Sequence, residues 1–380
     1  MKFRSSASAV MTSSVIIVIA MISLVSYIIS HRMSAEFEEK QFLLMGQIMQ
    51  SKLRGAEEQA IAAAEMITAM PAVRQAFAAS DRALLLATAQ EAFRVQHEKY
   101  GISQAQFHVA PAISLLRLHN PGSFGDDQSK IRNMVVEVNR SNGIRRGLEI
   151  TSSGIGVFGT TPVADEFGKP VGSFEVGKEV GPLLDALKKA YGFELAFFVN
   201  EKTLRETATA IRADIFSDQN RVGSFVKFTS THPELLKELV TDDTINVTEE
   251  THYLREVNGV PYGVLLQPVY DYAKKPIGVM AMAADFTETR SADGQAVVWQ
   301  ILLAVSSSIV LIGVILVMVR GKILRPLEIL NERVAALAEG AEGRGLPEGA
   351  GLCNEMRDLA DSCERLAARA ANEAGKGNTP

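Results

Sequence analysis

Residues 294–319, GQAVVWQILLAVSSSIVLIGVILVMV, decide how this chain is organised. They contain no charged residue, and a helix of this length crosses a lipid bilayer. Three basic residues and then Pro326 follow within seven positions. Beyond the proline, apolar residues recur at alternating steps of three and four, which predicts a helix with a coiled-coil seam. The residues of this seam are Leu327, Leu330, Val334 and Leu337. We interpret the stretch as a membrane span that continues directly into a packing helix.

A second run without Asp, Glu, Lys or Arg covers residues 5–31. Its apolar part, about residues 10–29, is too long for the core of an ordinary signal peptide, and no clear small-residue cleavage site follows it. We therefore predict an uncleaved transmembrane helix at residues 9–31, with a cleaved signal peptide as the alternative.

Basic residues predict the orientation of both spans. Lys2 and Arg4 precede the first span, in a cytoplasmic N-terminus of residues 1–8, and Arg320, Lys322 and Arg325 follow the second. Because basic flanks favour the cytoplasm, the intervening segment is expected outside the membrane. Cysteine usage agrees, since Cys353 and Cys363 are the only cysteines and both fall on the expected cytoplasmic side.

Composition excludes several classes of function. The net charge of −5 and the lack of a dense Lys/Arg run give no reason to expect nucleic-acid binding. The sequence contains no nucleophile elbow, phosphate-binding loop or His-Glu-x-x-His motif. A hydrolase using Glu149 and Glu175 as acid and base is disfavoured, because nothing fixes their separation. We expect no enzymatic activity and no cofactor.

The segment after the first span begins with a predicted stalk at residues 32–99. Residues 33–70 contain no proline and an imperfect apolar stripe, which indicates one long helix. Pro71 breaks it, and Asp81 is placed to cap a further helix that runs to about Lys99.

From residue 100 onward, Gly and Pro become frequent and short β-type runs appear. Residues 162–172 and 268–278 agree at Pro, Val, Asp, Lys, Pro and Gly, at a constant offset. We interpret this repeat as two tandem antiparallel-sheet domains, at residues 100–190 and 191–293; the alternative is chance recurrence of a common hairpin. The predicted strands are 105–110, 114–118, 147–150, 156–160, 171–176, 263–267 and 277–284.

The first copy has the more polar strands, which indicates that it binds the ligand while the second transmits or spaces. Its candidate binding residues are arginines suited to a carboxylate and glutamates suited to an ammonium group. These residues are Arg117, His119, Arg132, Glu149 and Glu175. The competing interpretation is that they are solvated charges or an internal salt bridge. We expect no metal, because His119 with Asp126 and Asp127 matches no recognised spacing, and His108 is expected to be a satisfied core histidine.

Two spans, a long exterior helix and tandem sheets resemble the double Cache sensors of bacterial chemoreceptors and sensor kinases. The motifs that carry this resemblance are residues 116–121 (LRLHNP), 124–127 (FGDD), 146–149 (RGLE) and 172–177 (GSFEVG). The resemblance implies an α+β fold with PAS-like sheets. It also implies a multi-pass receptor of the bacterial inner membrane, with a periplasmic domain that binds a small molecule, for which a carboxylate and an amine are the candidates.

Residues 320–371 resemble a HAMP linker, whose two helices would be separated by a glycine-rich connector at residues 341–351. This resemblance implies a homodimer with a four-helix bundle; a generic helical tail is the alternative. Beyond it the chain has only the polar tail 372–380. The expected receptor therefore acts on a separate cytoplasmic partner or lacks its output module. The other class of function considered is a regulatory or scaffolding subunit whose periplasmic domain binds a protein.

Overall fold

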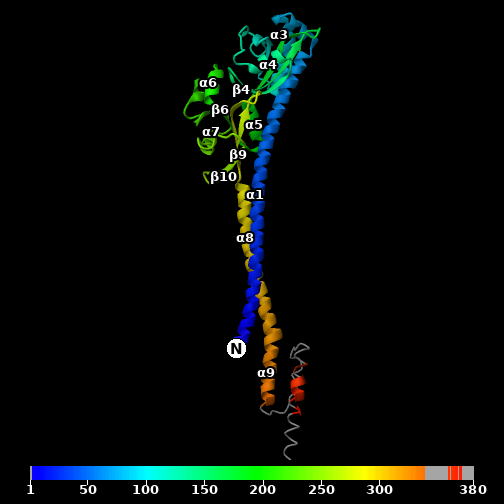
Figure 1. Ribbon diagram of the computed structural model, residues 1–380, viewed down its shortest axis with the longest axis vertical. Coiled ribbons are helices and arrows are strands. Elements are labelled where there is room, and N and C mark those ends of the chain that lie inside the picture. The colour runs from blue at the N-terminus through cyan, green and yellow to red at the C-terminus, as the bar shows by residue number, and fades with distance from the viewer. Residues whose placement is uncertain (1, 339–357, 360, 367, 370–380) are drawn as a thin grey trace, which may run out of the picture. The chain divides into compact units, whose positions relative to one another are not determined.

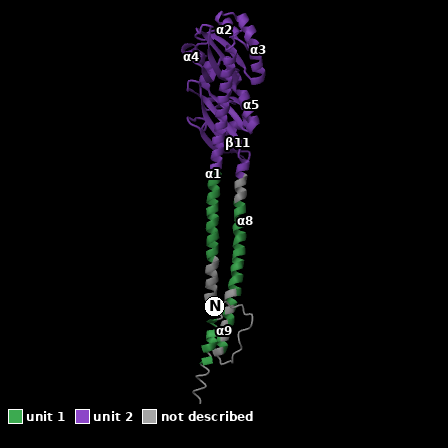
Figure 2. Cartoon of the chain, turned by 90° about the vertical axis from the view of Figure 1, so that its right-hand side faces the viewer, with its two compact units in different colours: residues 1–35, 291–380 green, residues 36–290 purple. Residues whose placement is uncertain are grey.

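The computed structural model describes residues 2–338, 358–359, 361–366 and 368–369. The chain divides into two compact units, which Figure 2 colours separately. One consists of residues 36–290, and the other of residues 1–35 with 291–380.

Three helices open the chain: α1 (Lys2–Thr68), α2 (Pro71–Ala78) and α3 (Arg82–Tyr100). The predicted long helix is confirmed, and it continues without a break from the first apolar run. The predicted cap is also present, because the Asp81 carboxylate accepts a hydrogen bond from the Leu84 N–H at 3.0 Å. Gly101 ends α3 with a φ of 67°, a conformation that glycine adopts without steric cost.

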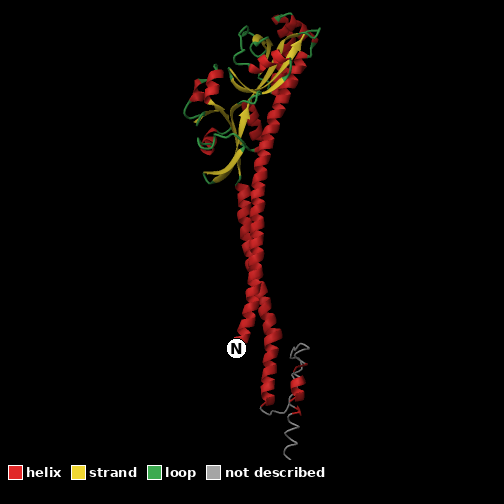
Figure 3. Ribbon diagram, viewed as in Figure 1, coloured by secondary structure: helices red, strands yellow, loops and turns green. Residues whose placement is uncertain are grey.

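The first sheet is antiparallel, with strand order β2-β1-β5-β4-β3. Each predicted strand of this region is confirmed, and helix α4 (Asn133–Ser141) is inserted between β2 and β3. Figure 3 shows the sheet as the group of strands beside the upper part of α1. Its strands are β1 (Gln104–Val109), β2 (Ile113–Arg117), β3 (Arg145–Thr151), β4 (Gly154–Ala164) and β5 (Pro170–Glu179).

The second sheet is also antiparallel, with strand order β7-β8-β6-β11-β10-β9. Helix α5 (Val180–Tyr191) leads into it from β5. Its strands are β6 (Glu194–Asn200), β7 (Arg221–Val222), β8 (Phe225–Ser230), β9 (Thr251–Val257), β10 (Val260–Tyr270) and β11 (Pro276–Asp285). The connections carry α6 (Glu201–Thr207), a short 3₁₀ helix (Ala213–Phe216) and α7 (Pro233–Leu239), the last starting at Pro233.

The sequence repeat corresponds to a structural repeat. In the β4–β5 turn, the Asp165 carboxylate accepts hydrogen bonds from the backbone two and four residues ahead, at 2.9 Å each. Asp271 makes the same two contacts in the β10–β11 turn, at 2.9 and 2.8 Å. The shared order of five strands extends this match to the sheets, with β8-β6-β11-β10-β9 repeating β2-β1-β5-β4-β3.

Helix α1 contributes to the cores of both sheets (Figure 1). Phe42, Met45 and Met49 are buried with the second sheet, whereas Ala64 and Ile67 are buried with the first. The closest approach is at Gly159 on β4, where an added Cβ would lie 2.5 Å from the backbone nitrogen of Ile61. Only a glycine allows the helix to lie this close to the strand.

The β10–β11 turn of the second sheet packs on β3 of the first. The Tyr272 N–H donates a hydrogen bond to the Leu148 carbonyl at 3.1 Å. Gly147 lies beneath the tyrosine with a φ of 147°, and a Cβ there would be 3.1 Å from the Tyr272 Cα. The β3–β4 turn in its turn contacts the loop that follows α6, because the Ser152 carbonyl accepts a hydrogen bond from the Ala210 N–H at 2.9 Å.

The remaining unit is helical where it is described. Helix α8 (Thr287–Met318) continues through a π-helical turn (Val319–Leu324) into α9 (Arg325–Ala338), at the position of the first predicted HAMP helix. Segments Ser13–Thr68 and Val297–Gly321 include helical stretches long and apolar enough to cross a membrane. The expected connector at residues 341–351 lies outside the described residues, as does most of the second predicted HAMP helix.

Two glycine-to-alanine substitutions test the packing of α1. Gly159→Ala is expected to lower the free energy of unfolding by about 1–3 kcal/mol, because the new methyl group meets helix backbone that cannot move aside. Gly55 is also in α1, but a Cβ added there would meet no neighbouring atom within 4 Å. Gly55→Ala is therefore expected to raise the free energy of unfolding by about 0.5–1 kcal/mol. Denaturant unfolding of the purified protein in detergent measures both, and equal effects would contradict this packing.

Candidate functional site

The first sheet has two chemically different faces, because successive residues of a strand point to opposite sides. On β1, Phe107 points to the face that α1, α2 and α3 cover. Its ring centroid lies 4.2 Å from that of Phe174 on β5 and 5.1 Å from that of Phe77 on α2. Gln106 and His108, which flank Phe107 on β1, therefore point to the opposite face.

The opposite face is polar and buried. Residues directly paired across two strands share a face, so the register identifies its members. His108 pairs with Ser114 on β2 and with Ser173 on β5, and Gln106 pairs with Glu175. All five side chains are buried. Helix α4 covers this region, since it contacts β3, β4 and β5.

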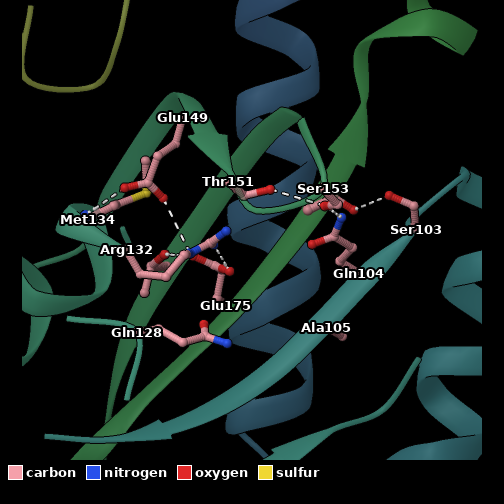
Figure 4. Close-up of polar contacts among 12 residues, drawn as sticks. Ser103, Gln104, Ala105, Gln128, Arg132, Met134, Glu149, Thr151, Ser153 and Glu175 are labelled. Atoms are coloured by element: carbon pink, nitrogen blue, oxygen red, sulfur yellow. Dashed lines mark hydrogen bonds and ion pairs between the residues drawn. The ribbon is translucent and has the colours of Figure 1, made fainter. Parts of the chain in front are cut away.

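Three buried charges lie at the centre of this face (Figure 4). Arg132, which immediately precedes α4, forms ion pairs with Glu175 and Glu149, and the Nε to Glu149 Oε2 distance is 3.5 Å. The three side chains are 5%, 3% and 5% exposed, respectively. The guanidinium carbon also lies 4.5 Å from the ring centroid of Phe158 on β4. The sheet thus holds one positive and two negative groups away from water.

Backbone and side-chain donors support the two carboxylates. The Met134 N–H, in the first turn of α4, donates to Glu149 Oε1 at 2.9 Å. The Thr160 hydroxyl on β4 donates to Glu175 Oε2 at 3.3 Å. Glu149 therefore connects strand β3 to the start of α4 through both the Met134 amide and the Arg132 side chain.

Several buried polar atoms beside this cluster have no hydrogen-bond partner among the described residues. They are both ring nitrogens of His108, the hydroxyl oxygens of Ser114 and Ser173, and the side-chain nitrogen of Gln106. A buried polar group left without a partner costs about 1–3 kcal/mol. The expectation that His108 is a satisfied core histidine is therefore wrong. It is a core residue, but neither of its ring nitrogens has a hydrogen-bond partner among the described residues.

Burial sets the protonation of these groups. It lowers the pKa of His108 well below its usual range, and the positive charges of Arg132 and Arg117 lower it further. Burial also raises the pKa of Glu149, an effect that the neighbouring Arg132 opposes. The site therefore combines a neutral imidazole with a buried carboxyl group, Glu149, that faces an arginine.

The structure brings together three of the five candidate residues, Arg132, Glu149 and Glu175. Arg117, on the same face at the end of β2, instead pairs with Asp126 at 2.7 Å, and this contact lowers the pKa of Asp126 to about 2. The His119 ring contacts the backbone of Ala105 at 3.2 Å. Among the described residues, no three His, Cys, Asp or Glu side chains cluster as a metal site would require.

Sequence reasoning did not select Gln106, Ser114 or Ser173 as binding residues. A signal for them is present, since Gln106 and His108 are two apart on one strand and Ser173 and Glu175 are two apart on another. That spacing places each pair on one face of a sheet. What the sequence does not supply is the order of the strands, which puts β1 next to β5.

The second sheet has no equivalent of this polar face. Its β6 strand buries Leu195, Phe197 and Val199 on one side and Ala196 and Phe198 on the other. Residues of α7 and the loop after it fill the side that corresponds to the site; they include Leu235, Leu236, Leu239, Val240 and Ile245. The prediction that the two copies differ in polarity is confirmed.

Comparison with known families identifies the region of the two sheets. Residues 46–289, more than half of the chain, match the dCache_3 family, described as the double sensory domain of two-component sensor kinases. The chain belongs to this family. Both sheets and the part of α1 from residue 46 onward fall within the matched range, so this region is a double Cache sensory domain. A search of curated proteins finds no significant match.

Several solved sensory domains match this chain at low identity. The ligand-binding domain of the Campylobacter jejuni chemoreceptor Tlp3, in complex with 4-methylisoleucine, is 11% identical over 67% of this chain and 93% of its own, with a TM-score of 0.43. The periplasmic domain of Vibrio cholerae LuxQ is 11% identical, covering 64% and 99%, with a TM-score of 0.40. The V. cholerae DctB sensor domain is 9% identical, covering 64% and 98%, with a TM-score of 0.36. What those proteins bind says nothing about this chain.

The burial of His108 predicts a measurable pH dependence. The folded ring stays neutral, whereas the ring in the unfolded chain takes up a proton below about pH 6.5, so the native state loses stability as the pH falls. His108→Asn is expected to remove up to about 1.4 kcal/mol per pH unit from that slope between pH 6 and 5. Denaturant unfolding at several pH values measures the slope, and identical slopes for the two proteins would contradict a buried neutral ring.

Proposed function

We propose that the chain is a transmembrane receptor of the bacterial inner membrane. Its double Cache domain binds a small extracytoplasmic molecule on the polar face of the first sheet, and it signals to a cytoplasmic partner as a homodimer. The observation that carries this proposal is the set of buried polar atoms without partners among the described residues, around Arg132, Glu149 and Glu175. A sensory domain needs such groups, converging on one place, to recognise a ligand.

Two apolar helices support the membrane topology. Large apolar side chains point outward along both; Ile17 and Ile22 are 66% and 61% exposed in the first, and Val317 is 73% exposed in the second. Lipid is the environment that favours such surfaces. Basic residues lie at both expected cytoplasmic flanks, and we keep the boundaries expected from sequence as part of this proposal: spans at residues 9–31 and 294–319, and sensory domains at 100–190 and 191–293.

A continuous structural route leads from the site to the second span. Glu149 is adjacent to Leu148, whose carbonyl binds the Tyr272 N–H in the β10–β11 turn. Strand β11 then runs from this turn to Asp285, and α8 begins two residues later at Thr287. A ligand that changes the pairing of Glu149 can thus move β11 and the start of α8.

The start of α8 is held against α1. Thr289 lies within hydrogen-bond distance of Gln41, at 3.3 Å, and Arg290 pairs with Glu38 at 3.4 Å. Phe286, just before α8, is buried, with its ring centroid 5.2 Å from that of Phe42 on α1. Signalling would shift these two helices relative to each other and pass the shift to residues 320–371. There the expected HAMP bundle would have two packings, and the ligand would favour the packing that is coupled to the receptor state with the higher ligand affinity.

A ligand screen tests the binding function. The purified full chain is screened by thermal shift against amino acids, organic acids and amines. A compound at 100 times its Kd is expected to stabilise the protein by about 2.7 kcal/mol. This gain should disappear in Glu175→Gln and persist in Glu166→Gln, an exposed residue of the β4–β5 turn. A blank screen, with a periplasmic protein that co-purifies, would instead indicate the scaffolding alternative.

A glycine variant tests the transmission route. Gly147→Ala is expected to keep ligand binding and lose signalling, because the new methyl group pushes against Tyr272 and requires an unfavourable backbone conformation. Disulfide formation between cysteines placed at Gln41 and Thr289, in a background lacking the native cysteines, reports the position of α8 against α1. Ligand should change its rate in the parent but not in Gly147→Ala.

The matched control is Gly168→Ala, which also has a positive φ, 79°, but has no neighbouring atom within 4 Å of the added carbon. It should respond to ligand as the parent does. A full response in Gly147→Ala would show that the signal leaves the site by another route.

A further inference from the structure

We propose that the ligand of this site is a small organic cation, a primary amine that carries a neutral hydrogen-bonding group at its other end. This inference rests on the proposed function and specifies the chemical class that the same site selects. It follows from the charge balance of the buried cluster and from the position of the neutral polar groups beside it.

The buried cluster holds two acidic groups and one basic group. Among the residues that the structure describes, Arg132 is the one cation paired with Glu149 and Glu175, and all three are at least nine-tenths buried. The next charged groups do not restore the balance, because Arg117 is neutralised by Asp126 and the nearby Asp271 adds negative potential at Glu149. A buried charge without a counter-ion is strongly unfavourable. With both glutamates ionised, a ligand cation brings the cluster to neutrality, whereas an anion doubles its excess charge.

The surroundings of the Arg132 guanidinium also suit an ammonium group. It lies between two carboxylates and 4.5 Å from the face of Phe158, an arrangement that stabilises cations in general. Oxygen Oε2 of Glu149 faces the guanidinium at 3.5 Å and has no aligned hydrogen bond among the described residues. An ammonium group with three donors can supply that bond.

The other end of the ligand is set by the row Ser114–His108–Ser173. Two hydroxyls and a neutral imidazole can both donate and accept, so they match a hydroxyl or amide group. This row lies two residues along β1 from the row that contains Gln106 and Glu175. Two residues of a strand span about 7 Å, which corresponds to a ligand backbone of about three to five carbons.

Three probes of one size and different charge test this class. They are 4-aminobutan-1-ol, 4-aminobutanoate and 4-hydroxybutanoate, each titrated calorimetrically into the full chain in detergent, with the three- and five-carbon analogues beside them. The amino alcohol is expected to bind at least about tenfold more tightly than the hydroxy acid of the same length, with the amino acid between them. Tightest binding of a hydroxy acid, or no binding of any amino alcohol, would overturn the proposal.

Substitutions in the cluster test whether Arg132 occupies the position of a ligand cation or binds an anionic ligand. If Arg132 occupies the place of the ligand cation, Arg132→Gln keeps or increases the affinity for the amino alcohol, and Arg132→Lys leaves it near that of the parent. If Arg132 instead holds an anionic ligand, Arg132→Gln abolishes binding and the proposal fails. Because Arg132→Gln leaves two buried carboxylates unpaired, Glu149→Gln provides a second test. It removes one negative charge and is expected to weaken amino alcohol binding at least about tenfold.

The outcomes distinguish this inference from the function on which it rests. If hydroxy acids or amino acids bind in preference to amino alcohols, and Glu175→Gln abolishes that binding, the proposed cationic ligand class is wrong but the proposed receptor function stands. Binding that no substitution in the cluster affects would overturn both the ligand class and the location of the site.

Discussion

The organisation of the sensory domain depends on burying one arginine between two glutamates beneath α4. Such a cluster is costly, since each charge loses its hydration, and it persists only where ion pairs and hydrogen bonds replace water. Here the arginine immediately precedes the helix and the glutamates come from two different strands. Ion pairs therefore join α4 to the sheet that it covers. Any molecule that changes this pairing changes how α4 and β3 are held.

The two sheets share an order of five strands but differ in the side chains that cover one face. In the second sheet, leucines and valines from α7 and the loop that follows occupy the place that α4 and the polar side chains occupy in the first. An apolar core is rigid and closely packed, and it transmits displacement well. The first sheet instead buries polar atoms that have no partner among the described residues, which is why we propose it as the binding sheet. The hydrogen bond from Tyr272 to β3 joins the polar sheet to the apolar one.

Much of the fold could be predicted from sequence. The predicted strands of both sheets could be recognised from β-type runs and turn residues, and the Asp81 cap from its position before an apolar helix pattern. The Asp165 and Asp271 turns were recognisable because six identities recur at one offset. Three of five binding candidates also lie together. The rest depended on tertiary contacts: Arg117 has a local partner in Asp126, and the row through His108 forms only because β1 lies between β2 and β5.

The central claim is that a ligand on the polar face of the first sheet acts through Glu149 and Tyr272 on the second span. Hydrogen–deuterium exchange of the full chain in lipid nanodiscs, with and without the compound that stabilises it most, tests this directly. The account predicts slower exchange in α4 and β3, with a further change in the β10–β11 turn and the first turns of α8. Protection confined to the second sheet, or to α4 alone with no change at residues 271–290, would contradict it.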